Sequence, residues 1–313
     1  MNKDQDKIFI AGHGGLIGSA ILKKLKENGF KHLIYLPRDD LDLEDKPSVV
    51  KFFLEQKPDY VFLAAGKVAG IVENKTFPAE FIQKNLAIQN NVFMAAQLTT
   101  VKKLIFFASS CMYPRACPQP MSEDMLLSGK LEPTSIAYAI SKLAGLYSCL
   151  AYNQQYKNNE FIPLIPNSVF GPHDNFNPDS GHVLSALISR FHDAIMYNYP
   201  SVTLWGSGNA RREFIYSEDV ADAAIFMMSQ STSKIEMPIN IGVGSDISIK
   251  ELALMLKNLT GFKGEILWDT SKPEGAPQKL LDSSRINQIG WKSQHSLEES
   301  ILKTYSWFKE NVA

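Results

Sequence analysis

The chain of 313 residues is long enough to bury a sizeable core, as one large domain or two modest ones. Hydrophobic residues make up 45% of it and charged residues 21%, and the net charge is -1, which is a composition typical of globular proteins. This balance provides no electrostatic footprint for nucleic acid or for an anionic membrane surface, so the expected partner is a small neutral or anionic ligand.

Short apolar runs alternate with helical stretches through the first half of the chain. Runs that are apolar on both faces are typical of strands buried in a parallel sheet. We predict strands at residues 7–11, 33–36, 60–64, 103–108 and 161–166, and helices at 17–29, 47–55, 77–98 and 137–155. This alternation predicts a doubly wound α/β fold of the Rossmann type.

The rhythm breaks after the fifth predicted strand, where Gly, Pro, Asn and Asp cluster at residues 171–178. A helix is predicted next, at about 182–197. Apolar runs at 210–217 and 238–243 are predicted to be strands that return to the first sheet. The C-terminal region is predicted to contain helices and loops that end near Trp307.

These elements predict two unequal parts. Residues 1–170 are expected to form a cofactor-binding Rossmann domain that is completed by about 211–243. Residues 171–313 are expected to contain a smaller α/β lobe that binds the substrate.

The start of the chain and its thiols favour a cytoplasmic protein. Met1 opens directly onto a polar segment, without a charged and then apolar leader. Cys111, Cys117 and Cys149 are an odd number of thiols, which is typical of a reducing compartment. No apolar run is long enough to cross a bilayer, and no spacing of Cys and His matches a zinc site. We therefore expect no membrane partner and no metal.

A glycine-rich turn follows the first predicted strand. In Gly12-x-x-Gly15-x-x-Gly18 the glycines would allow a tight turn and a close approach to a pyrophosphate, while the next helix offers free N–H groups to the anion. A glycine pattern alone is weak evidence. Its place at the first strand of an alternating α/β chain favours a dinucleotide site over an ordinary turn.

The choice between NAD and NADP depends on the end of the second predicted strand. A carboxylate there would bind the ribose hydroxyls of NAD, whereas a cation would bind the 2′-phosphate of NADP. Arg38 favours NADP, but Asp39 and Asp40 follow it and keep NAD open. Arg38 could also be an ordinary solvated charge.

Three further residues provide the parts for reducing a carbonyl. Ser109 lies at the end of the predicted strand 103–108, and Tyr138 and Lys142 are four apart on one face of a predicted helix. An ammonium beside a phenol is expected to lower the pKa of Tyr138 and make it a proton donor to the carbonyl oxygen. Ser109 would hold that oxygen.

Several blocks of sequence together resemble the extended short-chain dehydrogenase/reductase family. Within that family the likeness is to the GDP-sugar enzymes that act as 3,5-epimerases and 4-reductases, and it covers nearly the whole chain. The resemblance implies an NADPH-dependent conversion of GDP-4-keto-6-deoxy-D-mannose to GDP-L-fucose by a homodimer, whose shared surface would be the helices around 81–98 and 137–150. The blocks lie at residues 10–13, 64–68, 109–114, 131–134, 138–142, 171–176, 205–208, 212–214 and 279–282.

The resemblance also assigns roles in a two-step reaction. Inversion beside a ketone needs a base that removes the acidic proton and an acid that returns one to the opposite face. Cys111 matches the family's base and His182 its acid, while Ser109, Tyr138 and Lys142 match the reductive triad. From the residues alone, Cys111 could equally be a small buried hydrophobe and His182 a helix cap.

The binding residues that the resemblance implies form two sets. The cofactor set is Gly12, Gly15, Leu16, Ile17, Gly18, Arg38, Ala64, Ala65, Lys142, Pro166, Ser168, Val169 and His182. The substrate set is Ser110, Arg190, Trp205, Arg212, Glu274 and Lys279, in which Arg212 and Lys279 would neutralise a pyrophosphate and Trp205 would offer a flat face to a ring.

Departures from the family pattern keep other functions open. Gly14 stands where the family often has an arginine, and Ser168, Glu274 and Gln278 replace a typical asparagine, aspartate and basic residue. One alternative is therefore a related GDP-4-keto sugar, such as a 6-deoxy-keto-heptose used in surface-polysaccharide synthesis. Another is a regulatory protein that senses NADP without turnover, although the complete set of five chemical side chains argues against it.

Overall fold

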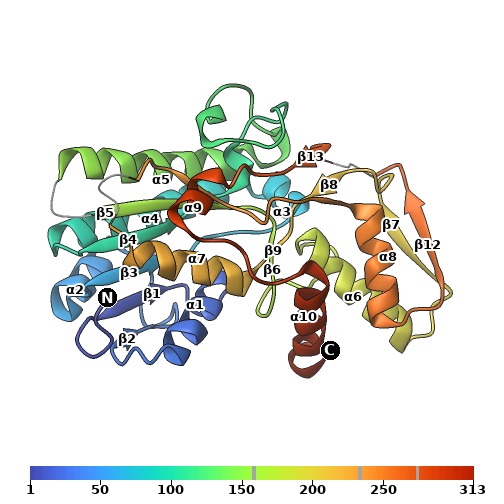
Figure 1. The fold of residues 1–313 in the computed structure, drawn as a ribbon, viewed down its shortest axis with the longest axis horizontal. Helices are drawn as coiled ribbons and strands as arrows, with labels where there is room; N and C mark the ends of the chain where they lie inside the picture. The colour runs from blue at the N-terminus through green and yellow to red at the C-terminus, as the bar shows by residue number, and fades with distance from the viewer. Residues whose placement is uncertain (157–159, 232–234, 273–274) are drawn as a thin grey trace.

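The computed structural model describes residues 1–156, 160–231, 235–272 and 275–313. Its centre is a six-stranded sheet, in which every pair of neighbouring strands is parallel and the order is β10-β5-β4-β3-β1-β2 (Figure 1). This confirms the predicted doubly wound fold. The strands are β1 (Ile8–Ala11), β2 (Leu33–Ile34), β3 (Tyr60–Leu63), β4 (Lys103–Phe107), β5 (Glu160–Pro166) and β10 (Ile239–Ile241).

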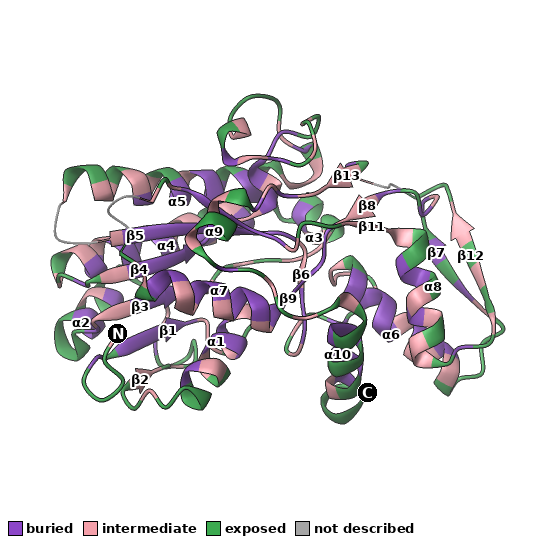
Figure 2. Ribbon diagram, viewed as in Figure 1, coloured by how far each residue is buried: buried purple, intermediate pink, exposed green. Residues whose placement is uncertain are grey.

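Helices cover both faces of this sheet. On one face α2 (Lys46–Gln56), α4 (Pro78–Leu98) and α5 (Ile136–Gln155) pack on side chains such as Phe9 and Phe106. On the other face α1 (Leu16–Glu27) and α7 (Ser217–Ser229) pack on side chains such as Ile10 and Phe107. Successive strand residues therefore serve opposite cores, which is why the strands read as continuous apolar runs. Figure 2 shows these strands as mostly buried.

The chain order reverses at the middle of the sheet. β1 is flanked by β2 on one side and by β3 on the other, so the connections leave β1 and β3 in opposite directions. The carboxyl ends of strands that separate in this way leave a crevice, which is where open α/β sheets bind ligands. The glycine-rich turn after β1 and the segment after β4 both lie at this edge.

The strand prediction for residues 210–217 was wrong. The structure has two short strands, β8 (Arg211–Arg212) and β9 (Ile215–Tyr216), and α7 begins at Ser217. The chain is interrupted because the carboxylate of Glu213 turns inward and accepts backbone N–H groups from other segments. Ser217, followed by two acidic residues, was a helix-start signal that the apolar run concealed.

The other predicted elements of the first half are confirmed within a few residues. The helix predicted at 77–98 is preceded by a separate short helix, α3 (Ile71–Thr76), which the sequence analysis missed. Met112 lies in a 3-10 turn, η1 (Ser110–Met112), directly after β4, and two more such turns follow, η2 (Glu123–Met125) and η3 (Pro133–Ser135).

A second lobe lies beyond the carboxyl edge of the main sheet (Figure 1). Its core contains Phe191, Leu204 and Leu252. The remaining elements are β6 (Val169–Phe170), α6 (Val183–Met196), β7 (Ser201–Trp205), β11 (Ile247–Ser248), α8 (Ile249–Thr260), β12 (Glu265–Asp269), β13 (Gln278–Lys279), α9 (Ser284–Ile289) and α10 (Leu297–Asn311). α6 confirms the helix predicted at about 182–197. β12 pairs with β7, β8 joins β11 and β13 in a small sheet, and β6 pairs with β9.

Candidate active site

The turn between β1 and α1 is closed by backbone contacts that only glycine permits. Gly12 has φ +85°, and a Cβ on it would lie 2.7 Å from the backbone nitrogen of Ala65. A Cβ on Gly18 would lie 2.1 Å from the carbonyl oxygen of Gly12. The first glycine therefore lets the turn pack against the end of β3, and the third lets α1 pack on the turn.

Two observations fit this turn to a dinucleotide. Gly15, the N-cap of α1, offers no side-chain cap, so the first N–H groups of the helix are available to an anion. His13 Nδ1 is buried and has no hydrogen-bond partner among the described residues, and the centre of its ring lies 5.2 Å from the centre of the Tyr35 ring after β2. Leu16, Ile17 and Ala64 border the same turn.

Arg38 lies in the loop after β2, as the 2′-phosphate reading requires, but its guanidinium has acidic neighbours. It donates a hydrogen bond to Glu44 at 2.6 Å and reaches Asp42 at 3.5 Å, with 65% of its side chain exposed. An exposed ion pair of this kind contributes about 0–1 kcal/mol, so it can be exchanged for a phosphate at low cost.

Ser109, Tyr138 and Lys142 come together at the end of β4. Ser109 is the N-cap of η1, and its hydroxyl oxygen accepts a hydrogen bond from the N–H of Cys111 at 3.2 Å. Tyr138 and Lys142 lie on α5, and both are buried. The hydroxyl of Ser109 is thus held between the thiol of Cys111 and the phenol of Tyr138, and it lowers the pKa of both groups through hydrogen bonds.

The expected lowering of the Tyr138 pKa was wrong. Lys142 Nζ donates to the carbonyl oxygen of Phe107 at 2.8 Å and lies 5.9 Å from the centre of the Tyr138 ring. Burial, together with the nearby Cys111 sulfur, raises the pKa of Tyr138 despite the hydrogen bond with Ser109. Tyr138 is therefore a fully protonated phenol at neutral pH, which suits a proton donor.

Lys142 is a buried cation without a carboxylate partner in the described part of the chain. Burial lowers its pKa from 10.5 to about 8. Between these pH values the unfolded chain holds a proton that the folded chain has lost, so the free energy of unfolding rises with pH through this window.

We expect the free energy of unfolding of Lys142→Met to exceed that of the wild type by an amount that shrinks on going from pH 7 to pH 10.5. The narrowing should be about 3 kcal/mol, from the 2.5-unit difference in pKa. Urea unfolding of both proteins across this pH range measures the narrowing. The variant also leaves the Phe107 carbonyl unpaired, but the cost of this does not depend on pH and cancels when values at two pH values are compared. If the difference in the free energy of unfolding between the two proteins does not change with pH, burial does not lower the pKa of Lys142.

Cys111 lies against a lysine. Lys279 Nζ on β13 donates to Cys111 Sγ at 3.7 Å, although the resemblance had assigned Lys279 to a pyrophosphate. Burial on its own would raise the pKa of the thiol, but Lys279, the Ser109 hydroxyl and His182 bring it below its ordinary value. Cys111 is thereby prepared to act as a thiolate, which is the form in which sulfur is a base.

We expect Lys279→Met to raise the pKa of Cys111 and to slow its alkylation by iodoacetamide about tenfold at pH 7. The measurement uses a Cys117→Ser background, which removes the other partly exposed thiol. Cys149 can remain because it is fully buried. Lys250→Met, an exposed lysine on α8, is the matched control. Equal rates of Cys111 alkylation at pH 7 in the Lys279 and Lys250 variants would exclude the Lys279 ammonium as the cause of the lowered thiol pKa.

His182 faces the same thiol from the second lobe. It is the N-cap of α6, with 42% of its side chain exposed, and its Nδ1 lies 3.4 Å from Asp174 Oδ1. Burial lowers the pKa of the imidazole, but Asp174 and then Cys111 outweigh that effect and raise it above its ordinary value. The imidazole is therefore protonated more readily than a free histidine and can act as an acid.

A buried polar network behind the thiol was missed from the sequence. Ser110 Oγ donates to Asn167 Oδ1 at 2.8 Å, and Asn167 Nδ2 donates to Glu213 Oε2 at 2.9 Å and to the carbonyl oxygen of Lys279 at 3.2 Å. Glu213 is fully buried and also accepts from the N–H of Leu281 at 2.9 Å. Burial raises its pKa although these donors oppose the shift. The network fixes β13, and with it Lys279, against η1.

Three other residues that were predicted to bind the substrate lie on separate elements of the second lobe. Arg212 on β8 is electrostatically coupled to Cys111 and Glu132. Arg190 on α6 donates to the carbonyl oxygen of Pro178 at 2.9 Å, and the exposed Trp205 ring is covered by Lys272 Nζ at 5.7 Å. Glu274 lies outside the described residues. Pro166 is the last residue of β5, Val169 is the first residue of β6, and Ser168 lies between these two strands.

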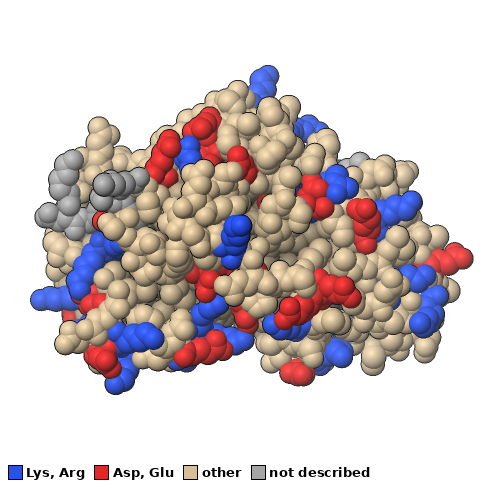
Figure 3. All heavy atoms as spheres, viewed as in Figure 1, with Lys and Arg blue, Asp and Glu red and all other residues tan. Residues whose placement is uncertain are grey.

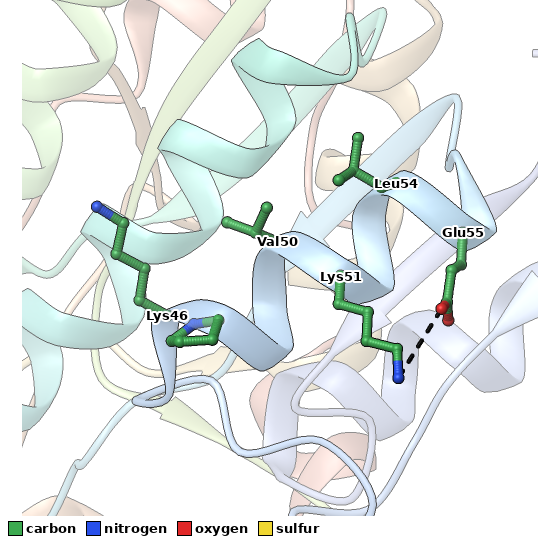
Figure 4. A pocket seen from close by; sticks show the side chains of 6 residues that line it. Lys46, Val50, Lys51, Leu54 and Glu55 are labelled. Carbon is green, nitrogen blue, oxygen red and sulfur yellow. Dashed lines mark ion pairs between the residues drawn. The ribbon is translucent and has the colours of Figure 1, made fainter.

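Surface hollows occur on α2 and in the second lobe. One, on α2, is lined by Lys46, Pro47, Val50, Lys51, Leu54 and Glu55, and it contains none of the predicted site residues (Figure 4). The other, in the second lobe, is lined partly by Arg211, Arg212 and Asp246. On the face shown in Figure 3, cationic and anionic side chains are interspersed, without an extended patch of one sign. No helix among the described residues has the length and apolarity needed to span a membrane.

Known proteins share both this sequence and this fold. The model of the NAD dependent epimerase/dehydratase family matches residues 8–242. GDP-L-fucose synthase 1 of Arabidopsis thaliana is 46% identical over 312 residues, which cover 100% of this chain and 96% of that protein.

Two solved structures extend the comparison. The GDP-6-OMe-4-keto-L-xylo-heptose reductase from C. jejuni superposes with a TM-score of 0.92 at 38% identity, covering 99% of each chain. A GDP-L-fucose synthetase from Naegleria fowleri bound to NADP superposes with a TM-score of 0.90 at 30% identity, covering 99% of this chain and 96% of that one. The chain therefore belongs to the NAD dependent epimerase/dehydratase family, as its resemblance to the extended short-chain dehydrogenases/reductases predicted.

Proposed function

We propose that this protein is an NADP(H)-dependent nucleotide-sugar enzyme that epimerises GDP-4-keto-6-deoxy-D-mannose at carbons 3 and 5 and reduces carbon 4, giving GDP-L-fucose. The observation that carries the proposal is the convergence of Cys111 with Ser109, Lys279 and His182 beside Tyr138. A reductase alone needs the hydroxyl and the phenol, but it has no use for an activated thiol facing an imidazole. The NADP-bound relative and the GDP-L-fucose synthase of Arabidopsis support the cofactor and the substrate.

In the epimerisation, Cys111 as thiolate removes the proton from a carbon beside the ketone. Ser109 and Tyr138 donate hydrogen bonds to the oxygen that becomes an enolate, and His182 protonates the opposite face of the carbon. After the step the thiol has gained one proton and the imidazole has lost one. Cys111 then releases a proton to solvent and His182 takes one up, which restores the starting state. Lys279 favours the thiolate form in which Cys111 begins each cycle.

In the reduction, the same oxygen site is used again. NADPH supplies the hydride when it is bound. Tyr138 gives its phenolic proton to the oxygen as negative charge develops there, and Ser109 keeps that oxygen in place. Lys142 holds its ammonium against the Phe107 carbonyl, where it stabilises a transient phenolate electrostatically.

A substrate panel tests the proposal. Purified protein is incubated with NADPH and several GDP-4-keto sugars, and product stereochemistry is determined by NMR. The proposal expects GDP-L-fucose from the 6-deoxy-mannose substrate with the highest kcat/KM. A higher kcat/KM for a GDP-linked keto-heptose would replace this substrate with the rival that the heptose-reductase likeness and Ser168 favour. If NADPH is not oxidised with any of these GDP-4-keto sugars, the proposal that the protein is an enzyme of this class fails.

The cofactor preference follows from the same assay. We assign Arg38 to the 2′-phosphate, since Gly14 offers no side chain to it. NADPH is expected to have a lower KM than NADH, and Arg38→Ala is expected to remove most of that difference.

We further propose a cytoplasmic homodimer in which residues 1–170, completed by about 211–243, bind the cofactor and the remainder of 171–313 binds the sugar nucleotide. The three cysteines are free thiols, which fits a reducing compartment. Ile136, Ile140 and Tyr147 are exposed on one face of α5 and would form a self-complementary surface. Light scattering that gives a mass of one chain would exclude the dimer.

A further inference from the structure

The carboxylate of Asp174 is buried in the loop that joins the two lobes, with 4% of its side chain exposed. Its Oδ2 accepts a hydrogen bond from the hydroxyl of Ser185, which is fully buried on the first turns of α6. Its Oδ1 accepts the N–H of Asn175 at 2.8 Å and faces His182 Nδ1 at 3.4 Å. The carboxylate is thus held from two sides with one oxygen directed at the imidazole.

We propose that Asp174 is the positioning residue for the acid of the epimerisation, fixing the orientation and proton placement of His182 through Nδ1. The inference rests on the proposed function, because it presumes that His182 protonates the substrate. A carboxylate on Nδ1 keeps a proton there, so that Nε2 is the nitrogen that gives and regains the mobile proton. Asp174 itself is not protonated in the step.

Position and burial support this role over a purely structural one. His182 begins α6 without using its side chain as a cap, so the ring is not needed for the helix start. Ser185 already satisfies one carboxylate oxygen, which leaves the other for the ring. The titratable groups that act on the imidazole are Asp174 from the loop after β6 and Cys111 from η1. Of these two, only Asp174 is within hydrogen-bond range of the ring in the structure.

The arrangement also separates the charges of the reacting centre. Lys279 lies against the sulfur of Cys111, and Asp174 lies against the imidazole of His182, so each of the two reacting groups has a partner of opposite charge. A base and an acid that face each other would otherwise exchange their proton directly. Asp174 therefore favours the state in which the imidazole carries the proton before substrate enters.

The test begins with the imidazole itself, without substrate. Protein labelled with 13Cε1-histidine is titrated by NMR, and the His182 resonance is identified by its loss in His182→Gln. In Asp174→Asn the His182 midpoint should move to lower pH. In Ser185→Ala it should move to higher pH, because the carboxylate loses a donor that shares its charge. Asp179→Asn removes an exposed charge from the same loop and should leave the midpoint in place.

The second measurement is deuterium uptake from D2O at the epimerised carbons as a function of pH. Asp174→Asn should lower the rate at least about tenfold near pH 7.5, and its acid-dependent limb should move in the direction of the NMR midpoint. If the His182 titration midpoint in both Asp174→Asn and Ser185→Ala equals that of the wild type, the inference is wrong, even if the enzyme epimerises its substrate normally. If the midpoints shift as expected but no GDP-keto sugar exchanges deuterium, the pairing stands and the proposed function fails.

Discussion

Replacing Cys111 by serine should abolish deuterium uptake at the epimerised carbons, with a loss of about 10²–10⁴-fold. The serine hydroxyl has nearly the size of the thiol but ionises far less readily, so Lys279 cannot make it an effective base at neutral pH. The variant should still bind NADPH, because the glycine-rich turn lies after a different strand. NMR of the substrate in D2O, with NADPH affinity measured by fluorescence, gives both results.

The matched control is Cys117→Ser, which removes a partly buried thiol six positions further along the chain. Its sulfur contacts the sulfur of Met125 at 3.3 Å and has no part in the proposed chemistry. Deuterium uptake should remain normal in this variant. Normal uptake in Cys111→Ser as well would show that another group removes the proton, and the sulfur would then have to be assigned a packing role.

Replacing Tyr138 by phenylalanine should reduce the rate of NADPH oxidation about 10²–10⁴-fold while deuterium uptake falls by a smaller factor. The phenol is the proton donor of the reduction, whereas in the epimerisation it shares the oxygen with Ser109. Because burial raises the pKa of Tyr138, no ionisation of this phenol should limit the reduction between pH 6 and 9. The measurement follows NADPH absorbance and proton exchange on the same sample.

Tyr152→Phe is the control on the same helix, since Tyr152 packs its ring on Phe161 at 5.2 Å away from the reacting centre. Its NADPH oxidation should match that of the wild type. If Tyr138→Phe loses exchange and reduction by the same factor, the phenol acts mainly on the enolate oxygen. Unchanged reduction would remove it from the triad.

The sheet could be predicted from the sequence because its strands are buried on both faces. Runs such as Ile8–Ala11 and Tyr60–Leu63 contain almost no polar residue, and helical periodicity separates them. The lobe was harder to predict because its strands are short and their pairing depends on distant segments. The apolar run around Glu213 was predicted to be one strand, since nothing local indicates that this carboxylate is buried among backbone donors from two other segments.

The chemical residues of the site were visible in the sequence, but their charges were not. Tyr138 and Lys142 follow from a spacing of four, yet the spacing does not reveal that the ammonium donates to Phe107 or that burial raises the pKa of the phenol. Lys279 lies against Cys111, which is 168 residues away in the chain, and Asp174 lies against His182, which is 8 residues away. Only the loop motif around residues 171–176 marked Asp174, and it carried no indication of the ring that faces it.

The position of β13 determines when a newly made chain becomes competent. All six strands of the main sheet have been made once β10 has left the ribosome, but Ile286 and Trp291, which pack in the core on one face of that sheet, follow later. Lys279, which activates the thiol, and Leu281, which anchors the strand to Glu213, are translated about forty residues later. Until then the sulfur lacks its cation and the second lobe is unfinished. The sheet core and the surroundings of the Cys111 thiol are therefore both completed only by the last segments of the polypeptide to be made.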